Sequence, residues 1–130
     1  MFWLSVVFAG LAALLHVLFF VMESIRWRHP RVWKTFGIQD QATADTLWPM
    51  AYNQGFYNLF LAIGAAVGLV LLLTGNAAAG RTLTLFCLAS MFGAGLVLSS
   101  TGPGYRRGAL IQGTPPLIGI ILMWLSTGPG

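Results

Sequence analysis

The sequence predicts an all-α integral membrane protein, an antiparallel four-helix bundle in which residues 1–130 form a single transmembrane domain. Three observations lead to this prediction: 57% of the 130 residues are hydrophobic, only 8% are charged, and the apolar residues gather into four long segments. A soluble domain has about a quarter of its residues charged. Lipid is therefore the expected solvent for most of this surface.

Four apolar segments are long enough to cross a membrane, because a bilayer core about 30 Å thick requires about 20 helical residues. They lie at about residues 2–22, 50–73, 82–100 and 109–126. The first segment lacks a basic start and a small-residue cleavage site, so we expect it to be retained and not removed as a signal peptide. A short soluble loop joins the first two helices. Brief Gly-containing turns join the others, which makes consecutive helices antiparallel neighbours.

The basic residues predict how the helices are oriented. Six of the seven lie in the first and third connections, and only Arg81 lies in the second. These six are Arg26, Arg28, Arg31, Lys34, Arg106 and Arg107. The positive-inside rule then places both connections in the cytoplasm and both termini outside. Four tryptophans near helix ends predict aromatic belts at the two interfaces: Trp3, Trp27, Trp48 and Trp124.

Polar side chains within the apolar segments are the informative residues, because lipid makes them costly to retain. The first helix contains His16 and Glu23. Their spacing of seven, at about 100° per residue, returns to nearly the same helix face about 10 Å further along. The second helix begins with the run Asn53-Gln54-Gly55-Phe56-Tyr57-Asn58, and the fourth contains Gln112 near its start. The predicted topology brings all of these groups to the cytoplasmic half of the bundle.

Each of these residues also has a structural interpretation. Glu23 could extend to the interface and pair with Arg26. His16 could be a hydrogen-bonded core residue, and the carboxamides could simply join helices. Small residues within the helices are assigned to close packing, namely Cys87, Gly64, Gly68, Gly93 and Gly95.

The polar pattern resembles a known family. The run from Asn53 to Asn58, with His16 and Glu23 before it and Gln112 near Pro115 after it, is similar to the small bacterial membrane proteins catalogued as domain of unknown function 1304. The similarity covers nearly the whole chain. It implies a four-helix architecture, the same shortlist of residues and a location in the bacterial inner (cytoplasmic) membrane, and it leaves the chemistry to argument.

The polar residues favour an acid–base enzyme, an isomerase or epimerase that needs no cofactor and acts on a lipophilic small molecule. Glu23 and His16 would act as acid and base, with Tyr57 as a third catalytic group. Four carboxamides would bind the substrate in a polar cavity, namely Asn53, Gln54, Asn58 and Gln112. The expected partners are this small molecule and the lipid bilayer.

Two other functions fit the same residues. A proton-coupled transporter or channel would use Glu23 as small four-helix exporters use a glutamate in their first helix, and it would work as a homodimer. A structural membrane subunit would use the polar residues only as contacts. No metal is expected, because His16 and Glu23 are too far apart to share an ion without other ligands. The net charge of +4 follows from topology and needs no nucleic-acid partner.

The predicted topology can be tested by cysteine labelling. A cysteine introduced at Ala42 should react with reagent from the cytoplasmic side, and one introduced at Ala78 should react from the opposite side. The reason is the asymmetry of basic residues between the connections. Labelling of both positions from one side would contradict the four-helix topology.

Overall fold

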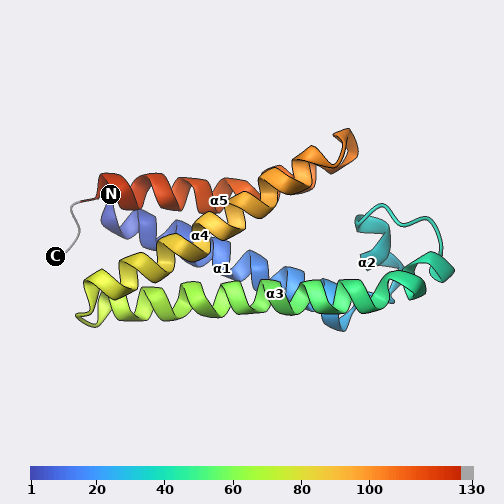
Figure 1. Ribbon diagram of the computed structural model, residues 1–130, viewed down its shortest axis with the longest axis horizontal. Helices are drawn as coiled ribbons and strands as arrows, with labels where there is room; N and C mark the ends of the chain where they lie inside the picture. The colour runs from blue at the N-terminus through green and yellow to red at the C-terminus, as the bar shows by residue number, and fades with distance from the viewer. Residues whose placement is uncertain (127–130) are drawn as a thin grey trace. The chain divides into compact units, whose positions relative to one another are not determined.

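The computed structural model describes residues 1–126, and in this range the chain contains helices and no strand (Figure 1). The elements are α1 (Phe2–Phe20), the π-helical segment η1 (Val21–Ile25), α2 (Pro30–Thr35), α3 (Gln41–Leu73), α4 (Ala77–Ser100), the 3-10 turn η2 (Pro103–Tyr105) and α5 (Arg106–Leu125). Four helical stretches in the described range are long and apolar enough to cross a membrane, namely Phe2–Ile25, Gln41–Leu73, Ala77–Ser100 and Pro103–Leu125. The predicted all-α membrane class is confirmed. Residues 127–130 of the predicted domain lie outside the described residues.

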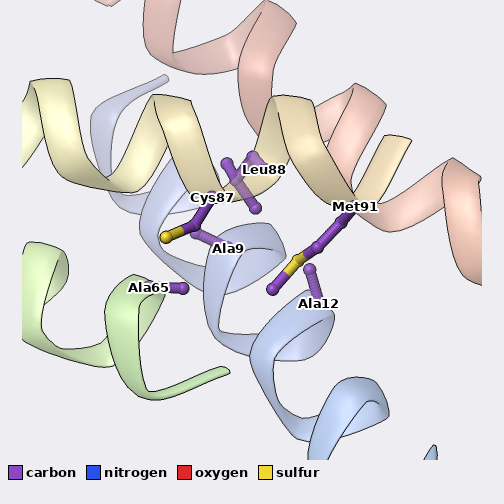
Figure 2. Packing of buried hydrophobic residues seen from close by; sticks show 6 residues of the cluster. All are labelled: Ala9, Ala12, Ala65, Cys87, Leu88 and Met91. Carbon is purple, nitrogen blue, oxygen red and sulfur yellow. The ribbon is translucent and has the colours of Figure 1, made fainter. Parts of the chain in front are cut away.

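The described chain forms two compact units. The first comprises Met1–Leu15 and the chain from Leu61 onward, and the second comprises His16–Phe60. In the first unit, α4 packs against α5, and a small core joins α1, α3 and α4 (Figure 2). The buried members of this core are Ala9, Ala12, Ala65, Cys87, Leu88 and Met91. Small side chains allow membrane helices to approach closely, and the predicted packing role of Cys87 is confirmed.

Glycines on α3 and α4 sustain the closest contacts in the first unit. A Cβ atom on Gly80 would overlap the backbone of Leu72, and one on Gly68 would overlap Thr84. Likewise, a Cβ on Gly95 would lie 3.2 Å from the Cα of Gly113 on α5. The predicted packing roles of Gly64, Gly68 and Gly95 are confirmed by such contacts. The prediction for Gly93 is wrong, because a Cβ there would have open space around it.

Arg81, near the start of α4, binds the end of α5. Its guanidinium donates hydrogen bonds to the backbone oxygens of Met123 and Ser126. The last carbonyls of a helix have no partner within the helix, and they carry partial negative charge. Arg81, the one basic residue in the second connection, therefore caps the end of α5 within the first unit.

The connection between α1 and α3, in the second unit, is folded and has its own core. Trp27, Trp33, Ala44 and Ala51 are buried there. The Trp27 indole donates to the carbonyl oxygen of Ala44 at 2.8 Å, and the Trp33 indole donates to Gln41 Oε1 at 3.2 Å. The assignment of Trp27 to an aromatic belt is wrong, because its ring is packed against protein and is only 5% exposed.

Helix α3 begins at Gln41, nine residues before the predicted start at residue 50. Asp40 caps this extension, since its Oδ1 accepts a hydrogen bond from the Thr43 backbone N–H at 2.7 Å. The same hydrogen bond holds the pKa of the Asp40 carboxyl below its usual value. The helix is about 50 Å long at 1.5 Å per residue, so it exceeds a bilayer core of about 30 Å. The first turns of α3 are polar, so a prediction of helix bounds from apolar segments did not include them.

Two glycines of α4 provide a matched test of this packing. We expect Gly80→Ala to destabilise the protein by about 1–3 kcal/mol, because the new methyl group meets backbone that cannot move aside. In contrast, Gly93→Ala should be neutral or stabilising by up to about 1 kcal/mol, because it meets nothing and favours the helix. Unfolding in detergent measures both. Equal loss of stability in the two variants would contradict this packing.

Candidate functional site

Glu23 lies in η1, at the end of the first membrane-spanning stretch, and is only 8% exposed. Its Oε1 accepts a hydrogen bond from the Asn58 side-chain amide of α3 at 3.0 Å. This contact brings together two of the polar residues that the sequence singled out on the first and second membrane helices. The alternative pairing with Arg26 is not formed, because no salt bridge joins these two side chains among residues 1–126.

The neighbouring residue, Ser24, fixes the distance between the two helices at this level. Its hydroxyl donates to the backbone oxygen of Tyr52 on α3 at 2.7 Å. Opposite Ser24 lies Gly55, where any Cβ atom would overlap the serine hydroxyl. The absence of a side chain at Gly55 therefore brings the two backbones close enough for the short side chain of Asn58 to reach Glu23.

A π-helical turn presents Glu23 to α3. The Arg26 backbone N–H bonds to the Val21 oxygen at 2.9 Å, five residues earlier, where an α-helix would bond four residues earlier. Such turns are rare and occur frequently at functional sites. The widened turn also invalidates the spacing argument that placed His16 and Glu23 on one face, since that argument assumed 100° at every step. Both side chains are nevertheless buried, His16 completely.

Aromatic rings pack against one another between and along α1 and α3 in the second unit. The Phe20 ring lies edge-on to Phe56 at 5.1 Å between centroids, and Phe56 contacts Tyr52 at 5.0 Å. Along α1, His16 is edge-on to Phe19 at 5.3 Å. Ser24, Gly55 and these rings were missed by sequence reasoning. The glycine within the polar run was the available signal, because it marks a close approach of backbones.

Three other predicted site residues of the second unit are not buried with Glu23 and Asn58. Asn53, Gln54 and Tyr57 occupy exposed positions on α3, and Tyr57 packs its ring edge-on to Phe60. Gln112 is half-buried on α5, in the first unit. The catalytic and substrate-binding roles of all these residues stay predictions.

The chemistry available at this site is that of a carboxyl group with one oxygen held by an amide donor. No hydrogen bond to the second oxygen of Glu23 is formed among residues 1–126, which leaves that atom able to take up or release a proton. In the same range, no group of three or more His, Cys, Asp or Glu side chains is placed to hold a metal ion.

The fold and this site define a small polytopic membrane protein with a hydrogen-bonded carboxyl group inside its first spanning segment. The chain belongs to the family described as protein of unknown function DUF1304, whose model matches residues 10–124. The resemblance predicted from the polar run is therefore confirmed. No curated protein and no solved structure matches the chain.

The contact between Glu23 and Asn58 can be measured against a matched control on α3. We expect Asn58→Leu to destabilise the protein by about 1–2 kcal/mol, because it leaves a buried carboxyl oxygen without its donor. Asn53→Leu removes the same group from an exposed position and should change stability by less than about 0.5 kcal/mol. Thermal unfolding in detergent distinguishes them. A loss as large for Asn53→Leu would argue against a specific pairing.

Proposed function

We propose that the protein is an acid–base enzyme of the isomerase or epimerase type, in which Glu23 exchanges a proton with a lipophilic small molecule. The observation that carries this proposal is the buried Glu23 carboxyl, which is held by Asn58 and has no neutralising cation bonded to it among residues 1–126. We further propose the bacterial inner membrane as its location, with both termini outside.

The energetics of burial favour function over packing as the reason for a glutamate at this position. Removing a carboxylate from water without an ion pair costs several kcal/mol. One hydrogen bond between membrane helices contributes only about 0.6 kcal/mol on average and about 1.7 kcal/mol at most. A glutamine, whose amide oxygen can accept from Asn58 without a buried charge, would therefore stabilise this contact at least as well. A carboxyl retained at such a cost within a membrane segment is a functional candidate by default.

The proposed reaction needs only proton transfer. A base removes a proton from carbon, and an acid returns one to the opposite face of that carbon or to a neighbouring position, so no net oxidation occurs. Glu23 supplies one group, with its free oxygen as the reacting atom, and His16 is the proposed second group. Tyr57 stays the proposed third. Asn53, Gln54, Asn58 and Gln112 stay the proposed substrate contacts.

The surroundings of Glu23 favour a lipophilic substrate. Aromatic rings of η1's neighbouring helices α1 and α3 pack on one another, as Phe20 does on Phe56. Tyr57 and Phe60, whose rings contact each other on α3, are well exposed, each at 59%. These side chains would meet a molecule that diffuses within the bilayer, and α3 carries carboxamides at the same level.

A structural role is the second candidate, and the cross-helix hydrogen bond itself favours it. If Glu23 and Asn58 only join helices, replacing them lowers the stability of the protein and leaves its activity unchanged. Proton-coupled transport uses the same carboxyl, but it requires two separated compartments. These three functions therefore predict different outcomes in detergent, where no gradient exists.

Solvent deuterium provides a test that works even when the substrate is unidentified. The purified protein is incubated in detergent and D2O with a total bacterial lipid extract, and mass spectrometry detects molecules that gain carbon-bound deuterium. We expect the native protein to label one class of lipophilic molecule. Glu23→Gln should abolish the labelling, because the amide keeps volume and hydrogen bonding but cannot exchange the proton. His16→Asn should reduce it strongly.

The matched control is Asp45→Asn, which neutralises an exposed carboxylate on the extension of α3. It should label at the native rate. Full labelling by Glu23→Gln would end the catalytic proposal. An unlabelled extract with the native protein, together with Glu23-dependent uptake into sealed vesicles, would favour transport.

A further inference from the structure

A cavity of about 520 Å³ lies where η1 leads into α2, and it is lined by Met22, Arg26, His29, Arg31 and Val32. The volume is within the range of sites for small ligands. Three of the five lining residues have basic side chains and two are apolar. The His29 ring accepts a hydrogen bond from the Arg31 backbone N–H at 3.3 Å, which caps the start of α2.

The cations of this connection fall into two pairs. Arg28 lies over the Trp48 ring at 4.7 Å, and Lys34 lies near the Trp33 ring at 5.6 Å. Both cations therefore cover the core of the connection between α1 and α3. Arg26 and Arg31 line the cavity instead, and neither guanidinium forms a salt bridge among residues 1–126. Two unpaired guanidinium groups on one cavity are suited to a phosphate, whose oxygens accept paired N–H donors.

The position of the cavity along the chain points to lipid. The first stretch that is long and apolar enough to span a membrane ends at Ile25, and Arg26 is the residue that follows it. Basic side chains at the end of a spanning helix are suited to contact lipid headgroups. Met22 lies within the span, one turn before Arg26. The cavity thus joins an apolar residue of the candidate span to basic residues that follow it along the chain. An anionic phospholipid presents these two chemistries in the same order.

We propose that this cavity binds the phosphate headgroup of an anionic phospholipid, with Arg26 and Arg31 on the phosphate and Met22 against the glycerol and acyl region. The site does not depend on proton transfer by Glu23. It is a binding site of defined stoichiometry, one lipid per chain, and not a general attraction between a basic loop and a charged surface.

Native mass spectrometry of the full-length protein in detergent tests this proposal, with dioleoyl phosphatidylglycerol and dioleoyl phosphatidylcholine as probes. We expect one phosphatidylglycerol to be retained per chain, in preference to phosphatidylcholine. Arg26→Gln with Arg31→Gln should weaken its binding by roughly tenfold or more, because two charge-assisted contacts are lost. Arg31→Gln alone should give a smaller loss in the same direction, and it protects the test against misfolding of the double variant.

The matched control is Arg28→Gln with Lys34→Gln, which removes the same charge from the same connection but not from the cavity. Its phosphatidylglycerol binding should remain within about twofold of native. Equal weakening by both double variants, or unchanged binding in both, would overturn the proposal. Displacement of the lipid by millimolar inorganic phosphate would reassign the cavity to the free ion. Glu23→Gln should bind phosphatidylglycerol normally, so a failed enzyme test leaves this result interpretable.

Discussion

The second compact unit depends on one constraint, that a carboxyl group placed within a membrane-spanning stretch must find its hydrogen-bond partner on another helix. Glu23 finds this partner in Asn58, and three neighbouring features support the contact. Gly55 removes the side chain that would separate the helices, and Ser24 bonds the backbone exposed by that approach. The π-helical turn then directs Glu23 toward α3. Small residues, close backbones and a polar pair are the usual means of joining helices in lipid, where the hydrophobic effect does not favour their association.

The connection after η1 extends this attachment along α3. Residues 23, 24 and 27 contact Asn58, Tyr52 and Ala44 in turn, so the chain leaving α1 runs antiparallel to α3 while hydrogen bonded to it at three levels. These contacts span about 20 Å of helix. The buried Trp27 and Trp33 then give the extension of α3 a core of its own, which explains why a polar segment beyond the membrane remains helical. The folded connection therefore attaches η1 to the extension of α3, and Asn58 attaches it further along the same helix.

Hydropathy and length predicted the membrane class and the four spans, because each span must by itself fill the bilayer. Hydropathy and length did not predict the features that depend on the direction in which a side chain points around its helix. The three carboxamides of the polar run on α3 were equivalent in sequence, yet of these three only Asn58 is buried against Glu23, since Asn53 and Gln54 occupy exposed positions around the helix. Gly93 and Gly95 differ for the same reason. A change of one residue in helical register, such as the π turn introduces, alters which side chain faces a neighbour, and no local pattern in the sequence signals that turn. The burial of Trp27 depends on a long-range contact with Ala44, so it could not be predicted from the local sequence either.

Positive charge near the ends of membrane helices is usually treated as a signal for topology alone, but here individual cations have separate tasks. Arg81 caps α5 by binding its terminal carbonyls, which a lysine with one point charge would satisfy less completely. Arg28 and Lys34 lie on indole rings and shield the core of the connection from water. Arg26 and Arg31 combine a shared cavity with guanidinium groups that no carboxylate in residues 1–126 neutralises. Topology requires charge on one side and is indifferent to its arrangement. The confinement of two unpaired arginines to one cavity just after a candidate span therefore needs a second explanation, and the proposed phosphate supplies it.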